Sequence, residues 1–161
     1  MISASISDFS KELYANIDRI WEKPPDEIKK MKEDLNVPRM YAWFKVNYTF
    51  HQLKSMGELL SVSAACANEG MSLDTIKAIN NRFITHQINL MKAQGLEDTV
   101  KILMKAGKMI DGAKNVEEYL AINDPLRIYV AKMGQAGWLD HEQYWSEMSS
   151  AWNIIDSLKG G

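Results

Sequence analysis

The feature that most limits how this chain can fold is the regular three- and four-residue spacing of its apolar side chains. The longest series spans about seven helical turns and consists of Trp43, Val46, Phe50, Leu53, Gly57, Leu60, Ala64 and Ala67. Such spacing keeps one stripe of a helix turned toward a neighbouring helix. Strand signals are scarce, because no Asn-Gly or Asp-Gly turn is flanked by alternating apolar residues. The pattern predicts an all-α protein, a helical bundle with long amphipathic helices.

Prolines, glycines and capping residues divide the rest of the chain. A first helix is expected over about Ser7–Glu22, because Lys23–Pro25 ends it, and a short charged helical turn follows through Lys32. The long series contains small residues from Gly57 onward, so a second backbone can come close there. The remaining expectations are a left-handed cap at Gly70, a helix from Ser72 or Asp74 to Gly95, and a shorter helix that ends near Gly112.

The last amphipathic stretch contains a proline. Asn115, with Glu118 three residues later, forms a start similar to a capping box. Asp124 before Pro125 then permits either a kink in one helix or a new helix with Asp124 as its cap. We favour the new helix, because the residue before a proline resists the helical conformation. A short helix from Asn115 and a long one from Pro125 are therefore expected to pack on different neighbours.

Composition limits the class of protein. The 161 residues, 46% hydrophobic and 25% charged, suit one domain over residues 1–161. Lys and Arg total 19 against 21 Asp and Glu, which does not support a nucleic-acid-binding surface. The single cysteine, Cys66, allows no internal disulfide and suits a reducing compartment. No secretion signal and no run of about 18 apolar residues is present, so we expect a cytoplasmic protein without a transmembrane segment.

Motifs for metal or phosphate chemistry are incomplete. In His141–Trp145, a tryptophan stands where a zinc protease needs its second histidine. A di-iron bundle needs Glu three residues before His, but those positions hold Tyr48, Phe83 and Trp138. The glycines at 112 and at 134–137 do not match a phosphate-binding loop. No catalytic residue, metal ligand or cofactor is assigned from the sequence, and an enzyme is disfavoured.

Two histidines permit a ligand-binding alternative. His51 and His86 lie on long helices among apolar residues, and we expect both to be partly buried and hydrogen-bonded. A pocket between helices could use either of them, and Asn47, Tyr48, Asn80 and Asn81 could help to line it. Cys66 lies among small residues and is expected to be a packing residue.

Aromatic residues gather in two clusters, at 40–44 and 143–152. Trp145 and Trp152 are seven residues apart and share a helical face, with Met148 between them. They can belong to the bundle core or to an interface, because aromatic residues and Met dominate both. The candidate interaction surface consists of Trp43, Phe50, Tyr144, Trp145, Met148 and Trp152.

The segment from Met109 to Met133 resembles the phasins, small helical proteins that coat polyhydroxyalkanoate granules. Phasins carry a short turn of the form alanine, lysine, acidic or amide, any residue, acidic or Gln, Glu, any residue, Leu, followed by a long amphipathic helix. The comparable places hold Ala113, Lys114, Asn115, Glu117, Glu118 and Leu120. The resemblance covers about the last third of the chain.

The resemblance implies a non-enzymatic, cytoplasmic homo-oligomer that buries an apolar helix face in partner subunits or on a polymer surface. Our first hypothesis is therefore a helical interaction protein, a phasin-like coat of an apolar polymer granule that self-associates through amphipathic helices. The alternatives are a ligand- or cofactor-binding helical bundle, and a helical accessory subunit that binds a larger protein partner in an enzyme complex.

Overall fold

The computed structural model describes residues 2–22, 39–93 and 95–160. Side chains are described for residues 2–20, 49, 51–93, 95–134, 153–154 and 157–158. The described residues form five helices and no strand, which confirms the predicted all-α bundle. The helices are α1 (Ala4–Glu22), α3 (Arg39–Asn68), α4 (Leu73–Ala93), α5 (Glu97–Gly112) and α6 (Val116–Gly160). The charged turn expected through Lys32 lies outside the described residues.

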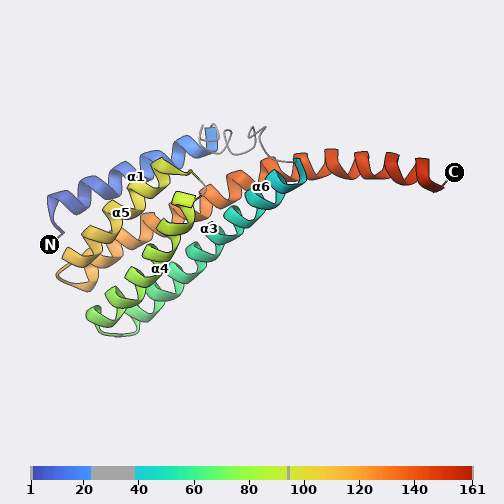
Figure 1. Cartoon of the computed structure of the whole chain (residues 1–161). Helices are drawn as coiled ribbons and strands as arrows, with labels where there is room; N and C mark the ends of the chain where they lie inside the picture. The colour runs from blue at the N-terminus through green and yellow to red at the C-terminus, as the bar shows by residue number, and fades with distance from the viewer. Residues whose placement is uncertain (1, 23–38, 94, 161) are drawn as a thin grey trace.

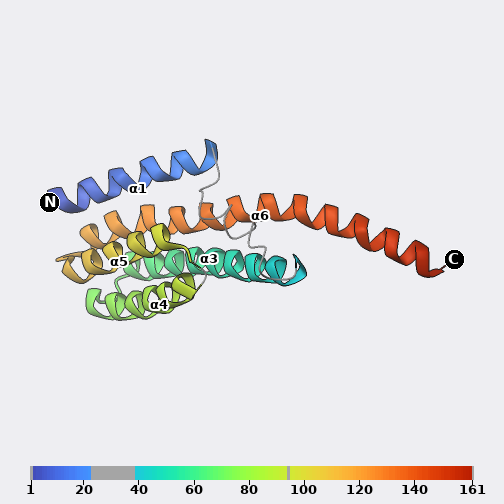
Figure 2. The same cartoon turned by 45° about the horizontal axis from the view of Figure 1, so that its top comes forward.

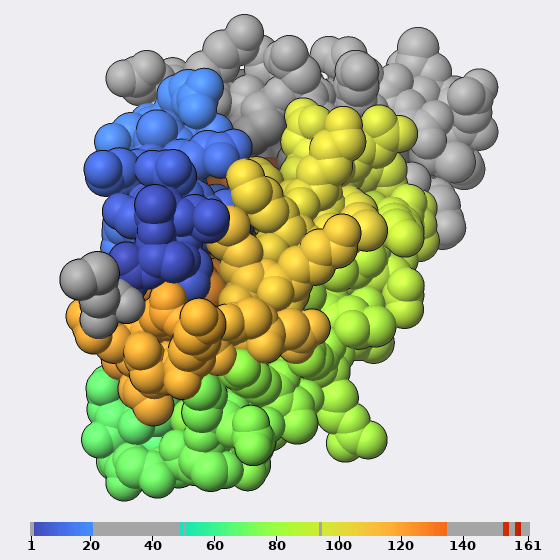
Figure 3. All heavy atoms as spheres, turned by 90° about the vertical axis from the view of Figure 1, so that its left-hand side faces the viewer, coloured from blue at the N-terminus to red at the C-terminus, as the bar shows by residue number. Residues whose placement is uncertain are grey.

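The longest helix, α6, is the central element of the bundle. It contacts α3, α1 and α5, while α4 packs on α3 and α5 (Figure 1). A view turned by 45° shows α1 on one side of α6, with α3, α4 and α5 on the other (Figure 2). Seen from its end, the bundle places the first turns of α6, in orange, between α1, in blue, and the connection from α3 to α4, in green (Figure 3).

The core forms where the apolar stripes of these helices meet. α1 is amphipathic at helical spacing, and each side chain of its apolar stripe is at most 7% exposed: Ile6, Phe9, Leu13, Ile17 and Ile20. α6 contributes a second stripe of fully or almost fully buried side chains: Tyr119, Ile122, Leu126, Tyr129, Val130 and Met133. The two stripes lie in one core cluster, so burial of apolar surface holds α1 on α6.

Local capping chemistry explains where the helices begin and end. The Ser3 hydroxyl accepts a hydrogen bond from the Ile6 amide at 3.3 Å, so α1 begins earlier than the predicted Ser7. Ser72, not Asp74, caps α4, because its hydroxyl accepts from the Thr75 amide at 3.3 Å. Gly70 has a φ of 97°, as predicted. The Gly70 and Met71 amides donate to the carbonyls of Ala67 and Cys66, which completes a Schellman ending.

The predicted restart at Asp124-Pro125 is wrong, because α6 is one continuous helix with Pro125 in its interior. A proline inside a helix costs about 3 kcal/mol, since it removes one backbone hydrogen bond. Burial of each large apolar side chain returns roughly 1.5–3 kcal/mol, and fully buried Ile122 and Leu126 flank the site within one turn. Asp124 pairs with Arg127 at 3.2 Å within the same helix. Packing on both sides of the proline therefore keeps the helix whole.

α3 and α6 are antiparallel and come very close at Gly57. A Cβ atom at Gly57 would lie 3.3 Å from the Cβ of Ala131 and 3.3 Å from the carbonyl oxygen of Arg127. Three residues further along α3, the Leu60 carbonyl accepts a hydrogen bond from the Asn123 side chain at 3.0 Å. These contacts confirm the close backbone approach predicted from the small residues, and they set the register of the two helices.

Candidate interaction surface

The register of α3 and α6 leaves the end of α6 without a neighbour from α3. α3 starts at Arg39, 18 residues before Gly57, whereas α6 continues to Gly160, 29 residues after Ala131. Counted from the contacts of Gly57 with Arg127 and Ala131, α3 reaches to about residues 145–149 of α6. We call residues 145–160 the arm. Within the described part of the chain, the arm extends past every other helix (Figures 1 and 2).

The predicted interaction surface is divided between two places. Trp43 and Phe50 lie on the first half of α3, whereas Tyr144, Trp145, Met148 and Trp152 lie at the start of the arm or on it. The side chains of all six lie outside the described residues. The antiparallel register places the aromatic half of α3 beside the part of α6 that leads into the arm, so the two clusters occur at one end of the bundle.

Described side chains on the arm are highly exposed. Leu158 is 79% exposed and Ile154 is 63% exposed. Neither residue belongs to the interaction surface predicted from the sequence. Ile154 and Leu158 are four residues apart, so they lie on the same face of the helix. The four-residue spacing of this pair is the signal that could have added it to the predicted surface.

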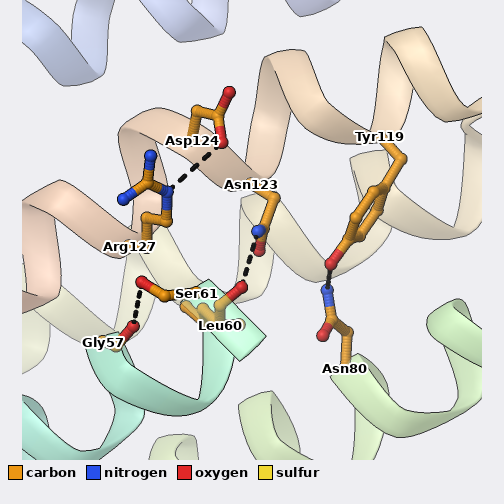
Figure 4. A network of polar contacts seen from close by, with 8 residues as sticks. All are labelled: Gly57, Leu60, Ser61, Asn80, Tyr119, Asn123, Asp124 and Arg127. Atoms are coloured by element: carbon orange, nitrogen blue, oxygen red, sulfur yellow. Dashed lines mark hydrogen bonds and ion pairs between the residues drawn. The ribbon is translucent and has the colours of Figure 1, made fainter. Parts of the chain in front are cut away.

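The bundle part of α6 carries polar groups that connect it to α3 and α4 (Figure 4). The Asn80 side-chain amide donates to the Tyr119 hydroxyl at 2.6 Å, and both residues are fully buried. Burial raises the pKa of Tyr119 to about 12, against the smaller opposing effect of the hydrogen bond from Asn80. The phenol therefore stays protonated at neutral pH, and its role is to hold α4 on α6.

A second polar contact ties the N-terminus to the start of α6. Asn115 caps the helix, because its side-chain oxygen accepts from the Glu118 amide at 2.8 Å. The Glu118 carboxylate accepts from the amides of Lys114, at 3.0 Å, and Ser3, at 3.1 Å. These two backbone hydrogen bonds lower the pKa of Glu118. The predicted capping pair is confirmed, but the carboxylate reaches Lys114 and Ser3, so it also anchors α1.

The predicted burial of the two histidines is wrong. His51 and His86 are both exposed, because each lies on the side of its helix away from the buried stripe. His86 lines a shallow, open depression on the outer face of α4 together with Asn81, Arg82, Thr85 and Asn89. That depression belongs to one helix and is not a pocket between helices.

The other lining residues predicted for a pocket do not converge either. Asn80 is in the core, while Asn81 points to the surface and donates to the Asp111 carboxylate. The side chains of Asn47 and Tyr48 lie outside the described residues. Cys66 is half-buried. Within the described part of the chain, no three His, Cys, Asp or Glu side chains come together as a metal site would require.

Comparison with models of known families, with curated proteins and with solved structures finds no match to this chain. None of the described helices is both long enough and apolar enough to cross a membrane. The arm therefore remains the strongest candidate site that the structure itself provides.

Proposed function

We propose that this protein is a non-enzymatic helical interaction protein, a phasin-like coat of an apolar polymer granule, that binds the granule and its own copies through the arm. The observation that carries the proposal is the extension of α6 beyond α3, with Ile154 and Leu158 63% and 79% exposed. A helix end with large exposed apolar side chains gains free energy when another apolar surface covers it.

The aromatic content of the arm supports the same proposal. Trp145, Met148 and Trp152 follow at three- and four-residue spacing on a continuous helix. Amphipathic helices that lie on apolar surfaces use such residues, because large amphipathic rings and flexible thioethers adapt to surfaces without a fixed shape.

Charge favours an uncharged apolar surface over an anionic lipid membrane. Carboxylates outnumber cations in the last part of α6, where Asp140, Glu142, Glu147 and Asp156 stand against Lys159. Helices that bind anionic membranes carry Lys and Arg on their polar face, and each carboxylate near such a surface is repelled. A neutral polyester granule imposes no such penalty on this helix.

Sedimentation with polyhydroxybutyrate granules tests the proposal. We expect the purified protein to sediment with the granules, and the double variant Trp152→Ser/Leu158→Ser to remain largely in solution. The matched control is Val62→Ser, because Val62 is also exposed, at 60%, but lies on α3. Anionic lipid vesicles of equal surface area should capture less protein. Equal sedimentation of the arm variant and the control would contradict a role for the arm.

A larger protein partner is the alternative occupant of the arm. Trp and Met are enriched at protein interfaces, so an accessory subunit of an enzyme complex would use the same residues. In that case the wild-type protein would not sediment with bare granules. In a binding assay with the purified partner protein, the wild type would bind and the variant Trp152→Ser/Leu158→Ser would not.

A ligand-binding bundle is supported by a different observation. The side-chain oxygens of Asn80, Gln87 and Asn123 are buried and accept no hydrogen bond from the described residues. Buried oxygens of this kind are normally satisfied by water or by a ligand with donors. A visible absorbance spectrum and a native mass of the purified protein test this: a chromophore or a stoichiometric added mass would support the alternative.

A further inference from the structure

α1 lies on the outside of a closed arrangement of the other helices. Among the described helices, α3, α4, α5 and α6 each pack on two of one another and form a ring of four, whereas α1 packs along α6 only (Figures 1 and 2). An ion pair at 3.3 Å also joins Glu12 of α1 to Lys105 of α5, and both side chains are more than half exposed. α1 can therefore leave α6 without opening the ring.

A hydrogen bond marks the side of α6 that α1 covers. The Glu118 carboxylate accepts from the Ser3 amide, just before α1 begins. Ile122 follows Glu118 by about one turn and is fully buried. α1 is 19 residues long and runs in the same direction as α6, so it ends beside about residue 137 of α6 (Figure 1). Beyond that point, α1 no longer covers this side.

The exposed pair on the arm lies on the same side of α6. Ile154 and Leu158 follow Glu118 and Ile122 by 36 residues each, which is ten turns of an α-helix. Ile154 is 63% exposed and Leu158 is 79% exposed. The side of α6 that is buried under α1 thus carries uncovered apolar residues about 25 Å beyond the end of α1.

α3 does not obstruct this side. Arg127, whose carbonyl oxygen lies at the close approach of Gly57, follows Glu118 by nine residues, or two and a half turns. α3 and α1 therefore lie on opposite sides of α6, as the turned view of the bundle also shows (Figure 2). A surface that binds the α1 side of the arm does not compete with α3.

We propose that α1 is a displaceable cover of α6. An apolar granule surface replaces it and binds one side of α6, from Ile122 under α1 to Ile154 and Leu158 on the arm. This inference rests on the proposed function. It adds which side of α6 binds the granule and which helix covers part of that side in the free protein.

The exchange suits the apolar stripe of α1 itself. Five side chains of α1 are at most 7% exposed: Ile6, Phe9, Leu13, Ile17 and Ile20. In water, the stripes of α1 and α6 cover each other, so α1 stays in place. On a granule, both amphipathic helices can lie with their apolar stripes against the surface, so the burial lost between them is regained.

Locking α1 in place tests the displacement. In a Cys66→Ser background, Glu12→Cys and Lys105→Cys place two thiols where the ion pair joins α1 to α5. Methanediyl bismethanethiosulfonate links such thiols, and reduction removes the link. We expect the linked protein to need about tenfold more granules for half-maximal sedimentation, because the contact loses at least one large apolar side chain. Reduction of the same sample should restore binding. Equal sedimentation before and after reduction would overturn the proposal.

Asn81→Cys/Asp111→Cys with the same linker is the matched control. The Asn81 side chain donates to the Asp111 carboxylate at the surface, so this pair joins α4 to α5 and leaves α1 unlinked. We expect the linked control to bind granules within about threefold of its reduced form. Equal losses in both linked proteins would show that the whole bundle opens on the granule, and a specific role of α1 would be excluded.

Hydrogen exchange of the free protein tests the cover without granules. The protein concentration is kept below the Kd of any dimer formed through the arm. The amides of residues 7–20 should exchange at least about tenfold faster than the slowest amides of α3 and α6, because α1 opens on its own. The link between positions 12 and 105 should slow them. If α1 were as well protected as α3, it would not be a displaceable cover, whatever the granule result.

The inference and the proposed function fail in distinguishable ways. If the wild type does not sediment with granules but α1 exchanges ahead of the ring of four helices, the granule function fails and α1 remains a detachable cover. If the wild type sediments and the link between α1 and α5 has no effect, the granule function stands and the displacement of α1 fails.

Discussion

The two parts of α6 have similar apolar periodicity and opposite surroundings. Between Val116 and Met133 the apolar stripe is buried by α1, α3 and α5, and Leu126 is fully buried. On the arm, Leu158 is 79% exposed. The helix does not change between them, since it is continuous from Val116 to Gly160. The difference shows that the position at which α3 begins decides which part of α6 is core and which part is available to a partner.

The largest expected effect comes from truncating the same residue type in each part. Leu126→Ala should lower the free energy of unfolding by about 2–5 kcal/mol, because it removes buried apolar atoms and leaves a cavity. Leu158→Ala should change it by less than about 0.5 kcal/mol for the monomer. Urea unfolding at a concentration below the dimer Kd measures both. Similar losses in the two variants would show that the arm is packed within one chain.

Pro125 provides the next test, because the sign of its effect depends on the continuity of the helix. In a continuous α6, Pro125→Ala restores a backbone donor in the helix interior and should stabilise the protein by about 1–3 kcal/mol. In a helix that restarted at Asp124, the same change would remove a favourable first-turn residue and would not stabilise. Urea unfolding of the variant distinguishes the two. Ala121→Gly is the control, because it lies in a helix in either case and should destabilise by about 1 kcal/mol.

Two asparagines on α6 permit a smaller comparison. Asn123 is fully buried and donates to the Leu60 carbonyl, so Asn123→Ala should cost about 1–2 kcal/mol. Asn153 is exposed on the arm, and Asn153→Ala should be neutral or slightly stabilising, because alanine has the higher helix propensity. Hydrogen exchange at α3 and α6 should report the loss at Asn123, and equal exchange in both variants would contradict the role of this contact.

Local rules predicted the ends of these helices well, and the surroundings of the helices poorly. Gly70 and Ser72 act through neighbouring backbone groups, so their roles follow from the sequence. The restart predicted at Pro125 is wrong because burial of its neighbours Ile122 and Leu126 against the other helices outweighs the local preference for a break. His51 and His86 were misjudged because apolar neighbours in the sequence lie on the opposite side of the helix. The division of the aromatic surface depends on where α3 begins relative to α6, which no local pattern contains.

The smallest expected effect concerns the anchor of α1, and it depends on pH. The Glu118 carboxylate has a pKa below its ordinary value of 4.5, because it accepts from the Lys114 and Ser3 amides. A group whose folded pKa is lowered stabilises the fold above its unfolded pKa, and this contribution is lost as pH falls through the lowered folded pKa. At pH 7, α1 should therefore be attached less strongly in Glu118→Gln than in the wild type. At strongly acid pH, where the wild-type carboxyl is protonated, the two proteins should not differ.

Hydrogen exchange of the α1 amides measures this attachment. At pH 7 the amides of residues 7–20 should exchange faster in Glu118→Gln than in the wild type, while those of α4 should change little. Glu117→Gln is the matched control, because Glu117 is the exposed neighbour on the same turn. If both variants loosened α1 equally, net charge at the start of α6 would be responsible, and the carboxylate would not be an anchor. If only Glu118→Gln loosens α1, specific polar contacts as well as burial hold the bundle part of α6. The arm is then the part of the helix for which the described chain provides no such contact.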